Sequence, residues 1–218
     1  MGIANYTELT AHIENWLDHT RFTSLLDEFI YLTEDRLNKE LRVKEMITRS
    51  TAPTSTSSRY LVHPTDYLEM KRLRLLTSPY KELMQISPEN ITKFDSTSPQ
   101  EPQFYCDVDE QIEFDSTPDA VYTVEMVFYE KIADLTASNT TNVILTAYPN
   151  LYLFGALVEA FMYGLEDERA AYFEGRFVKE LNMANNEQEK RARHSVPLSV
   201  NTDMPNVKNI RSRSIIRL

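Results

Sequence analysis

The chain has 218 residues, 42% of them hydrophobic, and a formal net charge of −10, with 23 Lys or Arg against 33 Asp or Glu. This composition is typical of a globular protein with one large core or two small ones. The only cysteine, Cys106, excludes a disulfide within the chain, and no run approaches the ~18 consecutive apolar residues of a membrane span. Because the sequence also starts without an apolar run, we expect a protein that is made and kept in a reducing cytoplasm.

The charge is distributed unevenly along the chain. Residues 186–218 carry seven Lys or Arg against three acids, which gives +4 and leaves −14 on residues 1–185. Phosphate binding depends on neutralisation by Lys and Arg, so the acidic first part should repel nucleic acid. The basic C-terminal segment is expected to be an arm for another component or for something acidic.

Two helices are expected near the N-terminus. Asn5 with Glu8 three residues later predicts a helix start at which each side chain caps backbone N–H groups, and Ser24 with Asp27 predicts a second start. Apolar residues then recur at helical intervals on both segments. Burial of these faces, at ~1.5–3 kcal/mol per large side chain, outweighs the weak surface ion pairs. The faces comprise Leu9, Ile13, Trp16 and Leu17, and then Leu25, Leu26, Phe29, Ile30, Leu37 and Leu41.

The middle of the chain changes to a β pattern. Residues 48–58 are polar and without period, which predicts a linker. Beyond them, runs rich in Tyr, Val, Ile, Phe and Leu are separated by turn residues, as in an antiparallel β domain. A short helix is expected to start at residues 87–90, and a Pro- and Ser-rich loop covers residues 96–102. The predicted strands are residues 59–62, 67–76, 81–86, 103–106, 111–114 and 121–129.

Residues 149–181 predict a helical hairpin with two apolar faces. Pro149 suits the first turn of a helix, where its missing N–H costs nothing. Gly164 followed by Leu165 suits a left-handed helix end with a hydrophobic contact, and Asp167 suits the cap of the next helix. Neither helix can bury its apolar face alone, so both need partners elsewhere in the chain.

Two glycines lie inside the predicted hairpin helices. Gly155 and Gly175 each cost roughly 1 kcal/mol relative to Ala in a helix interior. They indicate either close helix contacts at both positions or defects that the fold tolerates.

The order of helices, strands and helices predicts an α+β protein. We expect a helical bundle made from N- and C-terminal helices, residues 1–50 and 139–190, because each end of the chain needs the other's apolar face. An antiparallel β domain, residues 57–132, is inserted between them. Residues 191–218 are expected to form an extended C-terminal tail.

The sequence shows little sign of catalytic chemistry or of a cofactor or metal. The four histidines His12, His19, His63 and His194 are scattered, and no glycine-rich phosphate loop or Gly-x-Ser-x-Gly elbow is present. Cys106 lies in a predicted strand, where a small buried hydrophobe is expected. The acids of residues 107–113 lack the pattern of a calcium loop, and those of residues 166–168 fit a helix start better than glycoside hydrolysis.

The C-terminal run is the most unusual part of the sequence. Its β-branched residues alternate with arginines, a pattern that suits a peptide that adds a strand to a partner or fills a pocket there, its Arg side chains pairing with acids. A disordered end remains the alternative. The candidate contact residues are Ile210, Arg211, Arg213, Ile215, Ile216, Arg217 and Leu218.

Three motifs at the two helical ends resemble the head-to-tail adaptor, or connector, proteins of bacteriophages with short tails. None of the motifs is catalytic, and together with the order of helices around a β insertion they cover most of the first 185 residues. The matching text is Tyr6-x-Glu8-Leu9-x3-Ile13-x2-Trp16-Leu17, then Phe29-Ile30-x-Leu32-x-Glu34-x-Arg36-Leu37-x2-Glu40-Leu41-Arg42, and then Pro149-x-Leu151-x2-Phe154-Gly155-x-Leu157-x-Glu159-Ala160.

The resemblance implies a structural protein of the virion neck, synthesised in the host bacterial cytoplasm. It implies a dodecameric ring under the portal protein that continues the DNA channel, without specific DNA binding, and joins the portal to a nozzle or other tail protein. No enzyme activity and no membrane contact are implied. The C-terminal tail would reach the portal, and the outer helix faces would pack subunit against subunit, through Tyr152, Glu159, Tyr163, Arg169 and Arg176.

Two other classes of function stay open at this point. A tail-associated cell-wall hydrolase would need two carboxylates that converge in a pocket. An acidic DNA mimic would have no use for a cationic, isoleucine-rich tail. A ring without turnover distinguishes the adaptor from the hydrolase.

Overall fold

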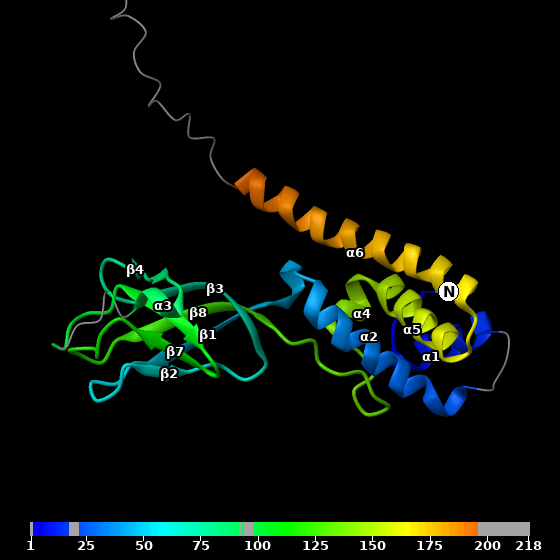
Figure 1. Ribbon diagram of the computed structural model, residues 1–218, viewed down its shortest axis with the longest axis horizontal. Coiled ribbons are helices and arrows are strands. Elements are labelled where there is room, and N and C mark those ends of the chain that lie inside the picture. The colour runs from blue at the N-terminus through cyan, green and yellow to red at the C-terminus, as the bar shows by residue number, and fades with distance from the viewer. Residues whose placement is uncertain (1, 18–21, 92, 94–97, 196–218) are drawn as a thin grey trace, which may run out of the picture.

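The computed structural model describes residues 2–17, 22–91, 93 and 98–195. Apart from one short helix among the strands (α3, Pro88–Ile91), helices occupy one part of the molecule and β-sheets the other, as Figure 1 shows. The α+β class is therefore confirmed. The proposed boundaries of the domains stay predictions.

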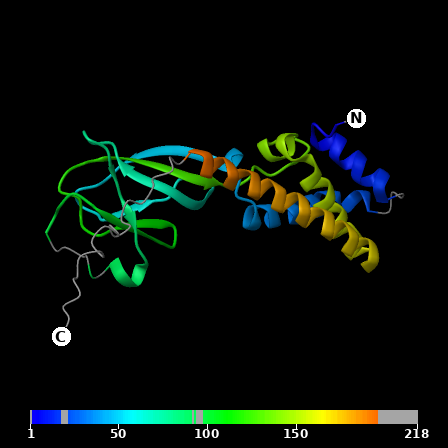
Figure 2. The ribbon, with the colours of Figure 1, turned by 90° about the horizontal axis from the view of Figure 1, so that it is seen from above.

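The helices come from both ends of the chain. The described residues form α1 (Tyr6–Leu17), α2 (Leu26–Glu40), α3 (Pro88–Ile91), α4 (Val143–Ala147), α5 (Pro149–Tyr163) and α6 (Asp167–Ser195), together with short 3-10 turns at Thr23–Leu25 and Lys44–Met46. α5 contacts α1, α2, α4 and α6. It lies between α2 and α6 in Figure 1, and Figure 2, which is seen from above, shows α6 passing over this part of the molecule.

The strands form two four-stranded sheets. One has the order β1-β8-β3-β4 and the other β2-β7-β6-β5. All pairs are antiparallel except the short pair of β5 with β6, which is parallel and departs from the prediction. The strands are β1 (Ile47–Pro53), β2 (Tyr60–Val62), β3 (Tyr67–Leu75), β4 (Lys81–Glu82), β5 (Met84–Gln85), β6 (Phe104–Val108), β7 (Gln111–Phe114) and β8 (Thr123–Glu130).

Two hydrophobic cores correspond to these two parts. The first core draws on residues between Leu9 and Met46 and between Ile132 and Ala184. The second lies where the sheets face each other, with Leu73 and Met126 from one sheet and Ile112 and Phe114 from the other. Both ends of the chain thus contribute to the helical core, and the segment between them has a core of its own.

The predicted linker at residues 48–58 is partly wrong, because its first half is strand β1. β1 pairs with β8 from Ile47 to Pro53 at the edge of its sheet. None of its residues is fully buried. A polar edge strand lacks the apolar alternation by which strands are recognised, and a proline is tolerated at such an edge.

Two predicted helix starts also need correction. Ser24 does not cap α2, which begins at Leu26 after a 3-10 turn without any side-chain cap. Asp167 is the first residue of α6 rather than its cap. The start at Asn5 is correct, since its side chain accepts a hydrogen bond from the backbone N–H of Glu8 at 2.9 Å. The Glu8 carboxylate accepts one from Ala4 N at 2.8 Å.

The two glycines of the hairpin differ in their surroundings. A Cβ on Gly155 would lie 2.4 Å from Cγ2 of the buried Thr33 and 3.2 Å from the ring of Phe177. α5 therefore approaches α2 and α6 at a point where only a glycine fits. A Cβ on Gly175 would meet nothing within 4 Å, so close helix contact holds for Gly155 alone within the chain.

The left-handed residue that ends α5 is Leu165, not Gly164 as predicted. Gly164 has a helical φ of −74°, whereas Leu165 has a φ of 60°. The N–H of Leu165 bonds to the carbonyl of Met162 and that of Glu166 to the carbonyl of Phe161, which is the Schellman pattern. A side chain at this position costs energy in the left-handed region, and that of Leu165 is 86% exposed.

Replacement of Gly155 by Ala should destabilise the chain by about 1–3 kcal/mol, because Thr33 is β-branched and cannot move aside. Gly175→Ala is the matched control, and we expect it to stabilise the isolated chain by up to about 1 kcal/mol. Urea unfolding of the two variants measures both changes. Equal effects of the two substitutions would contradict this account of the α2–α5 contact.

Replacement of Leu165 by Gly should stabilise the chain by about 1 kcal/mol, since Gly takes up a positive φ without strain and little packing is lost. Leu165→Ala keeps the strain and should bring no such gain. Thermal unfolding of the two variants compares them directly, and a gain for both would show that the side chain rather than the backbone is responsible.

Candidate functional site

A buried carboxylate joins α2 to the segment that returns from the sheets. Glu34 is 2% exposed, and its Oε1 accepts hydrogen bonds from the backbone N–H of Leu135 at 2.9 Å and from the hydroxyl of Tyr152 at 3.0 Å. Burial raises the pKa of Glu34 to about 7. The side chain of Asn142 completes the group, with Nδ2 at 2.6 Å from the Tyr152 hydroxyl and 2.9 Å from the carbonyl of Ala133.

Further polar contacts fasten both crossings between the helices and the sheets. Oδ1 of the buried Asn38 accepts from the N–H of Ile132 at 2.9 Å, where the chain returns. Where the chain leaves α2, Arg42 donates to Glu69 of β3 at 2.8 Å. The backbone N–H of Arg42 donates to the Asn185 side chain of α6 at 2.9 Å. The crossing where the chain returns is thus held by α2, and the crossing where it leaves is held by β3 and α6.

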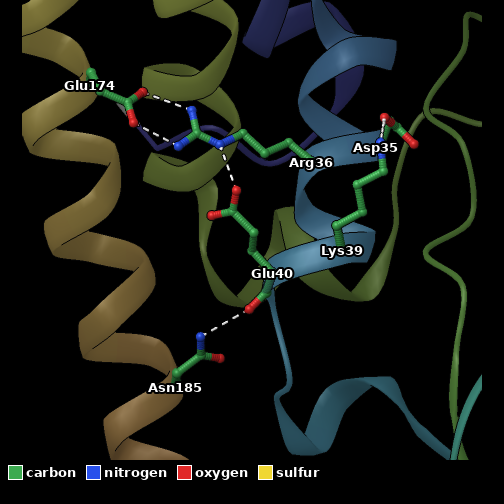
Figure 3. A network of polar contacts seen from close by, with 6 residues as sticks. All are labelled: Asp35, Arg36, Lys39, Glu40, Glu174 and Asn185. Carbon is green, nitrogen blue, oxygen red and sulfur yellow. Dashed lines mark hydrogen bonds and ion pairs between the residues drawn. The ribbon is translucent and has the colours of Figure 1, made fainter.

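An ion pair connects α2 with α6 across the edge of α5. Arg36 donates from its two terminal nitrogens to the carboxylate of Glu174 at 2.7 and 2.6 Å, as Figure 3 shows. It also pairs with Glu40, and its guanidinium lies 4.3 Å from the centre of the Phe177 ring. The guanidinium lowers the pKa of Glu174 below its ordinary value. A bidentate geometry of this kind fixes orientation as well as distance.

Cys106, Asp107 and Glu113, from the segments that were considered for catalysis or metal binding, are buried or bonded to neighbouring side chains. Cys106 is buried, and burial raises the pKa of its thiol to about 11. Asp107 accepts from Tyr67 at 3.1 Å, and Glu113 pairs with Arg59. In the ranges that the structure describes, no group of three or more His, Cys, Asp or Glu is placed to hold a metal ion. No helix within these ranges is long and apolar enough to span a bilayer.

The exposed face of the sheet that contains β1 carries a cluster of arginines. Arg49, Arg72 and Arg74 all reach the single carboxylate of Glu125, at 3.5, 3.3 and 2.7 Å. The guanidinium of Arg74 is the main cause that lowers the pKa of Glu125. Three cations around one anion leave positive charge in excess on this face of an otherwise acidic part of the chain.

The structure separates the five residues predicted for subunit packing. Tyr152 is fully buried and bonded to Glu34, so it does not lie on an outer face and that assignment is corrected. Tyr163 is exposed beside the rings of Phe22 and Phe29, and Glu159 is partly buried. The exposed Arg169 forms an ion pair with Glu166, and the exposed Arg176 donates a hydrogen bond to the hydroxyl of Tyr172. Their contact with another subunit stays a prediction.

The residues predicted for portal contact, Ile210 to Leu218, lie outside the described residues. The described helix α6 ends at Ser195, beyond the predicted hairpin end at Leu181, so residues 191–195 are helical and not part of an extended tail as predicted. In Figure 1 this end of α6 leaves the helical part on the side of the junction with the sheets.

Sequence patterns had missed two groups of residues. Glu34 and Asn38 occupy buried positions of α2. A helix face predicted from apolar residues alone does not include them because they are polar. Exposed apolar side chains on α2 and α6 were also missed, because a helix pattern is read from its buried side. They are Tyr31 and Leu32 on α2 and Tyr172, Val178 and Met183 on α6.

These features define a mixed α+β protein in which ionisable side chains such as Glu34, Arg36 and Arg42 join helices to each other, to a strand and to the returning segment. Residues 4–201 match the family model described as SU10 adaptor protein. The chain belongs to this family of phage head-to-tail adaptors, as its resemblance to such proteins had indicated. A search of curated proteins found no match. Membership makes the chain a structural adaptor of the virion and implies association with portal and tail proteins.

The buried Glu34 predicts a pH dependence of stability. The folded chain holds the Glu34 proton up to a pH of about 7, whereas the unfolded chain releases it near the ordinary glutamate pKa of 4.5. Stability from this group is therefore complete below about 4.5 and falls as the pH rises toward 7. Between pH 5 and 8 the wild type should lose about 2 kcal/mol relative to Glu34→Gln, which keeps an oxygen acceptor.

Denaturant unfolding at a series of pH values measures this difference. Glu28→Gln is the matched control, because Glu28 is an exposed acid of the same helix. Its difference from the wild type should stay level over the same range. A level difference for Glu34→Gln as well would show that Glu34 is ionised in the folded chain.

Proposed function

We propose that twelve copies of the chain form a ring beneath the portal, continue the DNA channel and join the portal to a nozzle or other tail protein. The observation that carries the proposal is membership in the adaptor family over residues 4–201. The helices from both ends form the body of each subunit, residues 1–50 and 139–190. The inserted β domain, residues 57–132, contacts the next tail component.

The charge of the chain supports a passive channel. Residues 1–185 carry −14, and DNA binding would require the opposite sign. An acidic lumen lets DNA pass without specific binding. This role needs no metal, cofactor or membrane.

The basic C-terminal tail supports a separate contact with the portal. Residues 196–218 contain four Lys or Arg and a single acid, Asp203. In the proposed contact, Arg211, Arg213 and Arg217 pair with acids of the portal, and Ile210, Ile215 and Ile216 fill apolar sites. A tail that becomes ordered on docking adds interface without a larger folded body. Leu218 completes this segment.

The outer helix residues support the packing of subunits side by side. Tyr163, Arg169 and Arg176 are exposed, and Glu159 is partly buried. Glu159 and Tyr163 lie on α5, and Arg169 and Arg176 lie on α6. In a ring, each would face a neighbouring copy.

Deletion of residues 196–218 tests the proposed portal contact. The full chain should co-sediment with portal-bearing particles and appear as a twelve-fold ring by native mass measurement or electron imaging. The truncated chain should lose the particles and keep its unfolding transition, because the folded cores end before the deletion.

A matched pair of charge variants separates the tail from basic charge in general. The triple change Arg211→Gln, Arg213→Gln and Arg217→Gln should weaken portal binding. The triple change Lys190→Gln, Arg191→Gln and Arg193→Gln removes the same charge from the end of α6 and should not. Full binding by the truncated chain would overturn the tail contact.

A further inference from the structure

The outward side of α6 has no covering partner within the described part of the chain. The inner side is buried through Ala170, Phe173, Phe177, Leu181 and Ala184. On the opposite side, Tyr172, Gly175, Lys179 and Met183 follow one another at helical spacing and are exposed. We name these four residues the α6 outer face. Two of them are large and apolar, with 58% of Tyr172 and 57% of Met183 exposed.

The outward side of α2 is a second uncovered face. Its buried side includes Phe29, Ile30, Thr33 and Leu37. The opposite side carries Glu28, Tyr31, Leu32 and Asp35, all exposed, and we name these the α2 outer face. Tyr31 is 57% exposed.

The two faces lie on different sides of the helical part. α6 runs along its upper edge in Figure 1 and α2 along its lower edge, with α5 between them. In the view from above, α6 lies over α5, which agrees with this order (Figure 2). A ring requires two different complementary patches on each subunit, because contacts between identical patches close at a dimer. Faces on opposite sides of one body meet this requirement.

We propose that the α6 outer face of one copy packs against the α2 outer face of a second copy. The proposal rests on the ring under "Proposed function" and identifies the contact that builds it. Each subunit gives its α6 outer face to one neighbour and its α2 outer face to the other.

The charges of the two faces identify the partner as α2 rather than a second α6. The exposed charged residues of α6 between Tyr172 and Asn186 are Arg176 and Lys179, both basic. Those of α2 are the acids Asp27, Glu28, Asp35 and Glu40 and one base, Lys39, which pairs with Asp35, so this side keeps a net negative charge. Two α6 outer faces would oppose like charges, whereas α6 against α2 opposes unlike ones. Two apolar side chains stand beside the charges on each face.

Gly175 gives the α6 outer face a point of close approach. Nothing in the described chain would contact a Cβ there, and Gly costs roughly 1 kcal/mol relative to Ala within a helix. At Gly155 of the same chain, the absence of a side chain lets α2 approach α5 closely. In the proposed contact, an α2 side chain of the second copy occupies the space above Gly175.

Replacement of Gly175 by Trp tests this contact. The isolated chain should keep its circular dichroism and unfolding transition, because the new side chain points into open space. The ring should be lost, in solution and on portal-bearing particles. Ala11→Trp on α1 is the matched control, an exposed small residue outside both faces, and its ring should form as in the wild type.

A charge exchange tests the identity of the partner face. Lys179→Glu and Glu28→Lys should each raise the concentration needed for half assembly by about tenfold. The double variant restores unlike charges across the contact and should assemble like the wild type. A double variant that is weaker than either single one would overturn the pairing of α6 with α2.

The outcomes distinguish this contact from the ring itself. A ring that still forms with Gly175→Trp overturns the α6 contact and leaves the proposed ring in place. A wild-type chain that stays monomeric with and without the portal overturns both. Assembly that stops at a dimer overturns the two-faced contact, since identical patches would then be joined.

Discussion

The constraint on which the fold depends is that α5 is apolar around its whole circumference and must be covered on every side. Ten of its 15 residues are buried, including Leu151, Phe154, Leu157 and Phe161. A helix of this kind is stable in water only inside a core. The covering helices come from both ends of the chain, α1 and α2 before the strands and α4 and α6 after them. The segment of strands between them must therefore leave and return close to the same place, and it needs a second core.

The place of return is held by polar groups instead of apolar ones. Glu34 and Asn38 lie on the buried side of α2 and accept from the backbone N–H groups of Leu135 and Ile132. A returning segment without regular structure has no neighbouring strand or helical turn to satisfy its backbone donors, and a buried donor without a partner costs about 1–3 kcal/mol. Side-chain acceptors on α2 supply what secondary structure cannot. The same need explains why a carboxylate is tolerated at 2% exposure with its pKa raised to about 7.

Sequence patterns predicted the parts of the fold that repeat with a period. The apolar periodicity placed α1, α2 and the α5–α6 hairpin, and runs of β-branched and aromatic residues placed strands such as β3 and β8. What lacks a period was missed. β1 is polar because it lies at an edge, α4 is too short to show a face, and the left-handed end of α5 falls on Leu165 where glycine is expected. Tyr152 was assigned to an outer face because periodicity tells buried from exposed sides only when one side is polar, and α5 has no polar side. The pairing of Glu34 with Leu135 spans a hundred residues and depends on the tertiary fold, which no local pattern contains.

The complete burial of α5 also determines what α2 and α6 can do. Because α5 supplies apolar surface in all directions, each covering helix needs only one side for the core. The other side is then free of any requirement from folding, and its composition is informative. A helix side that serves solubility alone would be expected to carry mixed charges and few large apolar groups. α2 and α6 instead expose Tyr31, Leu32, Tyr172 and Met183, beside a net negative charge on the outer side of α2 and the basic Arg176 and Lys179 on that of α6. Isolated apolar side chains on a surface are ordinary, but their alignment along two helices on opposite sides of one core is what a subunit requires when it must contact a neighbour on each side.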